Sequence, residues 1–443
     1  MDSIALKSLK VDFKNATVGL DAVRETLKTE LSRVQAQLSP GYLFKSDREL
    51  SPERRDPVEN HVVGGEPIFH AYDFDVGALV QDAERIVDVH GVTDVRNVVV
   101  IGNGGSISSS KALYHALVKY STDERYYGKR LCVVDDMDPD NIASIKRECS
   151  PESTIVLVIS KSGTTQGVMD SLSQFTGYKV CGITSRKDGR PLYERLKRMV
   201  GEHVGDLILE HPPIGGRFTG RTSVGTLPLA LLGMSKEELL DFNNGALQAY
   251  GRIGPHAGQE TNPALMTASV MRYLELKKDC VIIYAPMYSH RFDGFLHLIT
   301  QLQHESGCKS GEGQAMIAAS GPESQHNTNQ WFFGGKPNKA GVFFTIARPE
   351  VGGLSAFDGV LLEDSLSFES DGTIGDAASR IPPIPVLKVA VDGMTPQAAG
   401  CLMAFSQYAF GVYPALLRDL NPFDQPDVVR SKEIARELRS GGG

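Results

Sequence analysis

The sequence predicts an α/β protein with two parallel β-sheets, each covered by helices on both faces. The first observation is a series of short, continuous apolar runs rich in β-branched residues, separated by helical patterns. Strands buried on both faces have this pattern, whereas half-exposed strands alternate apolar and polar residues. The second observation is the length of 443 residues, which exceeds what one hydrophobic core usually supports. We therefore expect two doubly wound domains.

The expected strands form two groups along the chain. Helical patterns separate the strands of the first group, and a helix is expected over residues 289–304 between the first two strands of the second group. A long apolar helix is expected near the carboxy end, followed by a loop and a charged helix. The expected strands lie at residues 95–102, 131–136, 154–160, 179–185, 279–286, 341–348 and 386–391.

These patterns divide the chain into five parts. The amino-terminal part mixes a helical pattern with a charged stretch that has too few apolar residues to fold alone, so we expect a packing arm. The parts are residues 1–60 for this arm, 61–214 for the first α/β domain, 215–262 for a connecting segment, 263–394 for the second α/β domain and 395–443 for a helical carboxy-terminal arm.

Composition excludes several classes of protein. The net charge of −8 argues against a nucleic-acid partner, because phosphate backbones are bound by clusters of Lys and Arg. No apolar run approaches the roughly 20 residues of a membrane span, and the amino end lacks the apolar core of a signal peptide. The six cysteines show no metal-binding spacing and are expected to be reduced. We expect a cytoplasmic protein without metal or cofactor.

A glycine cluster follows the first expected strand. Gly102, Gly104 and Gly105 precede Ser106 at the start of a helical pattern, so backbone amides can approach an anion at the positive helix end. The alternative is a dinucleotide-binding loop. Ile107 occupies the third glycine position of that motif, which disfavours a dinucleotide.

A second loop, S-K-S-G-T-T-Q over residues 160–166, lies between an expected strand and an expected helix. Four hydroxyls and several amides at a helix start can hold a phosphate monoester. A simple helix cap would need one hydroxyl, so the phosphate interpretation is favoured. The residues that we expect to contact this group are Ser160, Lys161, Ser162, Thr164 and Thr165, with Gly105 and Ser106 nearby.

These loops and later stretches resemble the phosphoglucose isomerase family, whose members contain two sugar isomerase (SIS) domains. The S-K-S-G-T-T loop is similar to the SIS phosphosugar loop, and G-G-R-F-T at residues 215–219 is similar to a family signature. Three further segments resemble E-S-x-G-K, Q-H-x-x-x-Q and F-D-Q-x-G-V-E-x-x-K. They lie at residues 305–309, 325–330 and 423–432. The resemblance extends from about residue 102 to residue 432 and implies two SIS-type domains with helical arms at both ends.

The resemblance implies isomerisation of a phosphorylated hexose, between glucose 6-phosphate and fructose 6-phosphate, through ring opening and a cis-enediol. Glu305 would be the catalytic base and His326 would open the ring, assisted by Lys432. Gln301 and Gln425 would lie beside the substrate. The family also implies a homodimer in which His326 enters the site of the neighbouring subunit.

The chemistry alone supports these assignments. Moving a proton between adjacent carbons needs a carboxylate, and a fixed guanidinium stabilises the enediol oxygen better than a flexible ammonium. Arg217 follows two glycines that allow the backbone to direct it inward. Without the resemblance, Glu305 could be an exposed carboxylate at a helix end. Two alternatives remain: a noncatalytic phosphosugar-binding SIS protein, and an isomerase that also accepts mannose 6-phosphate.

The sequence departs from the family patterns at several positions. Gly307 and Cys308 appear in swapped order before Lys309, and Asp427 and Val429 replace a Gly and a Glu of the last segment. Gly167 stands where many members have a carboxylate that can orient the histidine. None of these departures removes a residue to which the resemblance gives a chemical role.

Overall fold

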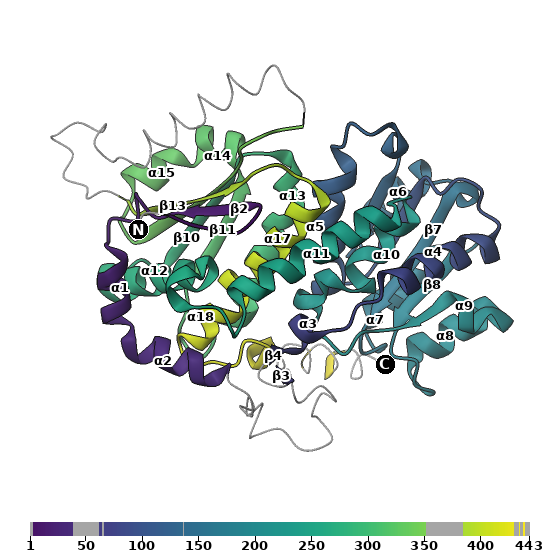
Figure 1. Ribbon diagram of the computed structural model, residues 1–443. Coiled ribbons are helices and arrows are strands. Elements are labelled where there is room, and N and C mark those ends of the chain that lie inside the picture. Colours follow the sequence, from purple (N-terminus) through teal and green to yellow (C-terminus); the bar gives the residue numbers. More distant parts are fainter. Residues whose placement is uncertain are drawn as a thin grey trace.

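The computed structural model describes residues 3–38, 62–63, 66–135, 137–350, 384–428, 434 and 437–438. In this part of the chain, two main sheets lie on either side of a helical layer (Figure 1). The predicted fold class is confirmed: both sheets are mainly parallel and each is flanked by helices. No helix within the described ranges is long and apolar enough to cross a membrane.

The first sheet has five parallel strands in the spatial order β6-β5-β7-β8-β9. Every residue of β5 and β7 is buried, which explains their continuous apolar sequences. The sequence did not predict the last strand, because three residues are too few to form a pattern. The strands are β5 Asn97–Ile101, β6 Arg130–Val134, β7 Thr154–Ser160, β8 Lys179–Thr184 and β9 Ile208–Glu210.

Helices cover both faces of the first sheet (Figure 1). Two of them, α5 and α7, begin directly after the glycine cluster and the hydroxyl-rich loop, as the sequence predicted. The amino ends of these helices therefore lie at the carboxyl edge of the sheet. The helices are α4 Val76–His90, α5 Gly105–Tyr114, α6 Pro139–Glu148, α7 Gln166–Ser173, α8 Pro191–Val200 and α9 Val204–Leu207.

The second sheet has the order β1-β2-β13-β12-β10-β11. Its last four strands are parallel, whereas β1 and β2 form an antiparallel hairpin that extends the sheet through β13, with Val11 opposite Val389. The sequence predicted only helical character for the amino-terminal arm, so this hairpin differs from that expectation. The strands are β1 Ser3–Ala5, β2 Leu9–Asp12, β10 Ile282–Met287, β11 Ala315–Ser320, β12 Lys339–Ile346 and β13 Val386–Val391.

The layer between the sheets contains the longest apolar helices. Helices α11 and α17 pack so closely that a Cβ on Gly400 would lie 2.0 Å from the carbonyl oxygen of Phe242. The expected long carboxy-terminal helix is present as α17, a π-helix and α18 in succession. The elements are α10 Ser223–Leu231, α11 Lys236–Ile253, α12 Pro263–Lys278, α13 Asp293–Leu302, α17 Pro396–Ser406, η10 Gln407–Val412 and α18 Tyr413–Leu416.

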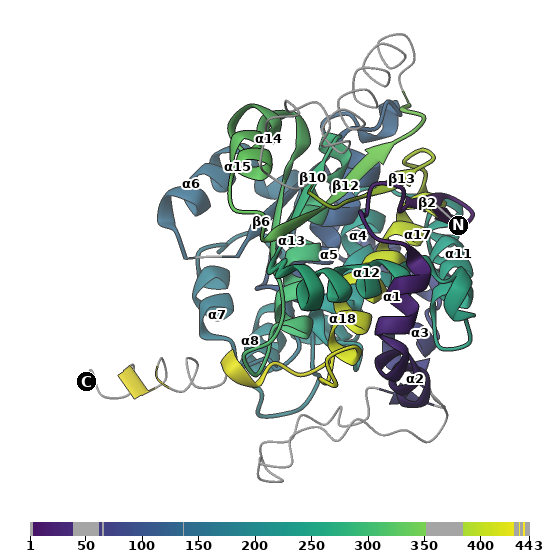
Figure 2. The same cartoon turned by 90° about the vertical axis from the view of Figure 1, so that its left-hand side faces the viewer.

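Shorter helices complete the described fold. In the amino-terminal arm, α1 and α2 pack against α12 and α18, and Arg33 donates to the carbonyl oxygen of Leu417 at 3.0 Å. Helices α14 and α15 lie at the outside of the molecule, next to the second sheet (Figure 2). These elements are α1 Leu20–Thr26, α2 Lys28–Gln37, β3 Val62–Val63, β4 Glu66–Pro67, α3 Ile68–Ala71, η2 His115–Lys119, η3 Glu124–Tyr126, α14 Gly321–Asn327 and α15 Asn329–Gly334.

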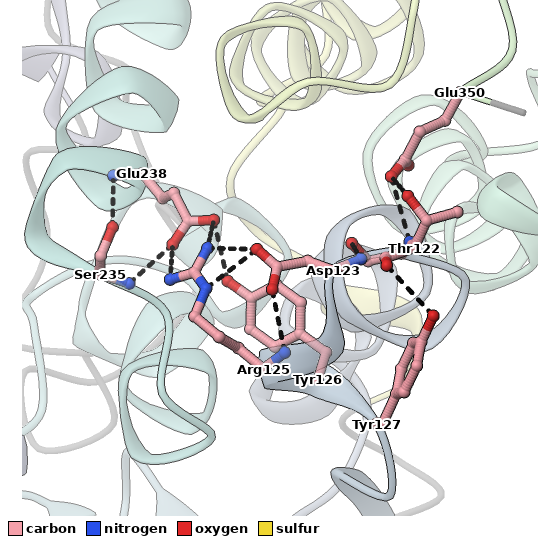
Figure 3. A network of polar contacts seen from close by, with 9 residues as sticks. Thr122, Asp123, Arg125, Tyr126, Tyr127, Ser235, Glu238 and Glu350 are labelled. Carbon is pink, nitrogen blue, oxygen red and sulfur yellow. Dashed lines mark hydrogen bonds and ion pairs between the residues drawn. The ribbon is translucent and has the colours of Figure 1, made fainter.

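A polar network joins the segment around η3 to the start of α11 (Figure 3). Arg125 donates to Asp123 at 2.6 Å and to Glu238 at 3.0 Å. The hydroxyl of Tyr126 also donates to Glu238, at 2.9 Å. Glu238 is at the same time part of a capping box, because its Oε2 accepts from the backbone N–H of Ser235 at 2.8 Å. One carboxylate therefore caps α11 and connects it to η3.

Candidate active site

Arg217 and Glu305 form an ion pair at the centre of the candidate site. Nη1 of Arg217 donates to Oε2 of Glu305 at 3.0 Å. The guanidinium is buried, whereas 30% of the Glu305 side chain remains exposed. Arg217 lies in the 3-10 helix η6 Gly216–Arg221, and Glu305 lies in the π-helix η9 Gln303–Gly307 that continues α13. A π-helical turn of this kind is often found at functional sites.

Gly105 is required by a backbone contact between two loops, because it packs directly against Gly216. A Cβ on Gly105 would lie 2.2 Å from the carbonyl carbon of Gly216, so a larger residue at position 105 cannot be accommodated. The loop after β5 therefore packs directly against η6. This contact places Arg217 beside the amino end of α5.

The guanidinium of Arg217 is held at each of its nitrogens. Nε donates to the hydroxyl of Ser306 at 2.8 Å, and Nη2 donates to the carbonyl oxygens of Pro422 at 2.7 Å and Asp424 at 3.1 Å. Burial lowers the pKa of Arg217, and the negative charge of Glu305 opposes that effect. The side chain is a fixed positive charge with little freedom to move.

The second carboxylate oxygen of Glu305 accepts a hydrogen bond from Gln301, which in turn accepts one from Ser108 of α5. Nε2 of Gln301 donates to Oε1 of Glu305 at 2.9 Å, and Ser108 donates to Oε1 of Gln301 at 2.9 Å. The sequence placed Gln301 one helical turn before Glu305, and the structure brings them into contact. Ser108 was not predicted, because only the packing of α5 against α13 brings it near. Both oxygens of Glu305 are thus oriented.

Lys309 holds the loop that contains residues 421–425. Its Nζ donates to the side chain of Asp424 at 2.5 Å and to the carbonyl of that residue at 2.7 Å, and also to the carbonyl of Asn421. Lys309 is 5% exposed, and burial lowers its pKa. Sequence reasoning treated Lys309 only as part of a motif and missed this contact. Gln425, which is half-buried, follows directly in the same loop.

The hydroxyl-rich loop lies between β7 and α7. Gly163 has a φ of +62°, a conformation that glycine adopts without strain. The hydroxyl of Thr164 donates to Ser162 at 3.0 Å, and the hydroxyls of Ser160 and Thr165 lie 3.4 Å apart. Ser162 and Thr164 are exposed, while Ser160 is buried and Lys161 and Thr165 are half-buried. The turn therefore presents hydroxyls at the start of a helix, as predicted.

The glycine cluster occupies the neighbouring position on the sheet. Strands β5 and β7 are paired in parallel, so the loops after them share one edge. Gly104 has a φ of +53° and comes directly before α5, and Ser106 in the first turn is half-buried. The two predicted anion-binding loops are thus adjacent, and the same α5 contributes Ser108 to the relay behind Glu305.

Of the two remaining residues with a predicted catalytic role, the structure describes only His326. His326 lies exposed on α14, and the described contacts do not connect it to Glu305. Lys432 falls outside the described residues. Gly167 lies in the first turn of α7, where a Cβ would meet Met137 at 3.9 Å, so the backbone has room for a larger side chain. The glycine is therefore not imposed by packing.

No group of three or more metal-ligating side chains occurs in the described part of the chain. A groove of about 540 Å³ lies between α6 and α7, lined by residues that include Met137, Ile142, Lys146 and Asp170. None of the predicted site residues lines this groove. The polar groups that surround the Glu305 carboxylate are a guanidinium, hydroxyls and a side-chain amide.

Two mainly parallel sheets, with hydroxyl-rich and glycine-rich loops at adjacent helix starts of the first sheet, define a doubly wound α/β fold. Residues 84–178 match the model of the family described as phosphoglucose isomerase. A probable glucose-6-phosphate isomerase of Haloarcula marismortui is 28% identical over 383 residues, which are 81% of this chain and 82% of that relative. The glucose-6-phosphate isomerase of Methanocaldococcus jannaschii is 26% identical, with coverage of 80% and 87%. The chain is thus similar to these relatives over about four fifths of its length.

Solved structures share the fold. A crystal structure of a glucose-6-phosphate isomerase from Chlamydia trachomatis matches with a TM-score of 0.77 at 22% identity, covering 99% of this chain and 90% of that one. A hypothetical protein from Thermus thermophilus matches with a TM-score of 0.71 at 24% identity, covering 98% and 100%. The fold is therefore common to these proteins along nearly their whole length.

Proposed function

We propose that this protein interconverts glucose 6-phosphate and fructose 6-phosphate, a reaction of glycolysis and gluconeogenesis, without a cofactor. The observation that carries the proposal is the oriented carboxylate of Glu305, which contacts Arg217 at 3.0 Å and Gln301 at 2.9 Å while remaining partly exposed. The names of the relatives support the same reaction.

In this proposal, Glu305 transfers the proton between carbons 1 and 2. It removes the proton from one carbon of the open-chain sugar and returns it to the other, which gives a cis-enediol between the two steps. Negative charge develops on the neighbouring oxygen during this transfer. The buried guanidinium of Arg217 is already fixed beside Glu305 and can stabilise that charge without reorganisation.

The phosphate would bind to the hydroxyl-rich loop and the start of α5. Ser160, Ser162, Thr164 and Thr165 offer hydroxyls, and amides at the amino ends of α7 and α5 are directed toward the carboxyl edge of the sheet. Lys161, Gly105 and Ser106 lie in the same two loops. Gln301 and Gln425 would contact the sugar hydroxyls.

Ring opening requires a second subunit in this proposal. His326 is exposed on α14, as a residue that acts in a neighbouring site would be. We therefore propose a homodimer in which each His326 enters the partner's site, where Lys432 assists. The protein would work in the cytoplasm, and its six free cysteines fit a reducing compartment.

The direct test measures conversion of fructose 6-phosphate, with the glucose 6-phosphate formed oxidised by an NADP-dependent dehydrogenase. Turnover by the purified protein and its loss in Glu305→Gln protein prepared in the same way are expected. Binding of fructose 6-phosphate without turnover would instead indicate a noncatalytic SIS protein. Formation of mannose 6-phosphate in the same mixture would show the broader specificity.

A mixing experiment tests whether His326 crosses between subunits. Glu305→Gln and His326→Ala homodimers are each expected to be inactive. Unfolding and refolding the two together creates mixed dimers in which one site has both residues intact, so activity should return to as much as about a quarter of that of the wild type if half the dimers are mixed. Mixtures that stay inactive, although mixed dimers are detected by differential tags, would place His326 in its own subunit's site.

A further inference from the structure

Two cysteine thiols face each other at an edge of the first domain, away from the site described above. Sγ of Cys132 and Sγ of Cys149 lie 3.6 Å apart. Cys132 is half-buried on the edge strand β6, and Cys149 is the buried residue that follows α6. Both thiols are free. Because a disulfide has a sulfur–sulfur distance of about 2.05 Å, the two sulfurs need to approach by only about 1.5 Å.

The surrounding contacts hold the two cysteines in this arrangement. Arg130, two residues before Cys132 and on the same face of β6, forms an ion pair of 2.9 Å with Glu148, the residue before Cys149. The hydroxyl of Tyr178 donates to the carbonyl of Cys149 at 2.8 Å. The edge strand and the end of α6 are therefore already joined by a polar contact beside the thiol pair.

None of the other four cysteines has a second thiol within contact, and all six lie in the described part of the chain. Cys280 and Cys308 donate to backbone carbonyls, and Cys181 and Cys401 are buried. The contact between Cys132 and Cys149 thus distinguishes this pair from every other cysteine in the protein.

We propose that Cys132 and Cys149 form a reversible intramolecular disulfide when the protein encounters a peroxide. A thiolate of the pair attacks the peroxide oxygen, which breaks the O–O bond and gives a sulfenic acid and hydroxide. The second thiol then attacks the sulfenic sulfur and expels water. The net reaction of two thiols with hydrogen peroxide is one disulfide and two waters.

The hydrogen bond between the sulfurs favours the first step. The thiols of Cys132 and Cys149 share a hydrogen bond, which lowers the pKa of the Cys149 thiol and raises the pKa of the Cys132 thiol. A shared proton of this kind makes one thiolate of the pair easier to form than an isolated buried thiolate. Cys132 is only half-buried, which gives a small oxidant access to the pair.

The cross-link would lie at the end of α6 opposite to the site. The loops that approach Glu305 follow the carboxyl ends of the strands, whereas Cys149 comes at the carboxyl end of α6, just before β7 starts. We therefore expect oxidation of this pair to leave isomerase activity within about twofold of that of the reduced protein. This inference does not depend on the proposed function, because its main readout is chemical.

The test counts thiols after exposure of the folded protein to a small excess of hydrogen peroxide. Catalase removes the peroxide, and the protein is then alkylated in denaturant and weighed by mass spectrometry. The expected count falls from six alkylated cysteines to four. Peptide mapping should recover the peptides of Cys132 and Cys149 as one cross-linked species, and dithiothreitol should restore six alkylated cysteines.

Two variants test the pair and a third is the control. Oxidised Cys132→Ser and Cys149→Ser proteins should each lack the cross-linked species. Cys181→Ala removes a buried thiol of the same sheet, and its count of alkylated cysteines should still fall by two on oxidation. If one serine variant fails to fold, the peptide map of the oxidised wild type still shows whether Cys132 and Cys149 are cross-linked. Six intact thiols after oxidation, oxygen addition at Cys132 without a cross-link, or a disulfide to another cysteine would each overturn the proposal.

Discussion

Arg217 donates to Glu305 at 3.0 Å across 88 residues of sequence, and the two residues come from different segments of the fold. The contact exists because Gly216 packs against Gly105 and because a π-helix continues α13 at Glu305. The same guanidinium binds carbonyl oxygens of the loop at 422–424. One side chain therefore connects the glycine loop, the carboxylate and the carboxy-terminal loop.

Arg217→Lys should lower kcat/KM by about 10² to 10³, because an ammonium cannot donate to Glu305, Ser306 and Pro422 at the same time. Steady-state kinetics with fructose 6-phosphate measure this loss. Arg348→Lys is the matched control, since Arg348 is 81% exposed. If Arg217→Lys retained the kinetics of the wild type, the fixed guanidinium would have no part in catalysis.

Glu305→Gln should lower kcat by about 10² to 10⁴, because an amide cannot accept the transferred proton. Exchange of the substrate's carbon-bound hydrogen with solvent deuterium, followed by NMR, should fall by the same factor. Glu312→Gln changes a half-exposed carboxylate of the following loop and should keep exchange near that of the wild type. Rapid exchange in Glu305→Gln would assign the base to another residue.

Thr165→Leu should raise the KM for fructose 6-phosphate by about tenfold or more, because it removes a hydroxyl and places bulk at the start of α7. Thr176→Leu, in the exposed segment after the same helix, is the control and should leave KM unchanged. An unchanged KM in Thr165→Leu would move the phosphate site to another part of the protein.

Lys309→Met should destabilise the protein by about 3 to 5 kcal/mol, because it leaves the carboxylate of Asp424 without its buried cation. Urea unfolding measures the change. The double variant Lys309→Met, Asp424→Asn removes both charges and should recover part of that loss. A double variant as unstable as the sum of the two single variants would show that the pair is not coupled.

We expect Glu238 to stabilise the folded protein at neutral pH and to lose this effect in acid. Hydrogen bonds from Ser235, Arg125 and Tyr126 outweigh the effect of burial and lower the pKa of Glu238 in the folded state. A lowered folded-state pKa means that the stabilisation is present above the unfolded pKa of about 4.3 and is lost as pH falls through the folded value.

Urea midpoints measured between about pH 3 and pH 7 should therefore fall less steeply on the acid side for Glu238→Gln than for the wild type. Glu237→Gln, the exposed neighbour in the same turn, should keep the slope of the wild type. Equal slopes in all three proteins would mean that the network in Figure 3 does not contribute through the charge of Glu238.

Continuous apolar runs made the central strands predictable. Strands β7 and β13 have the predicted bounds, and β5 differs only at its ends, because a strand buried on both faces needs apolar residues at nearly every position. The edge strand β11 and the hairpin of β1 and β2 were not predicted. Their short, partly exposed segments carry a weak pattern, and they form strands because a neighbouring strand pairs with them.

The sequence by itself determined the fold class, and it identified the two loops proposed to bind an anion and the residues proposed for proton transfer, because local patterns and motifs are contained in contiguous segments. Only the tertiary structure decided that Ser108 supports Gln301, that Lys309 binds Asp424, and that Cys132 meets Cys149. These partners are 193, 115 and 17 residues apart. Such contacts depend on how helices and loops pack against each other, and no local periodicity encodes which side chains that packing brings together.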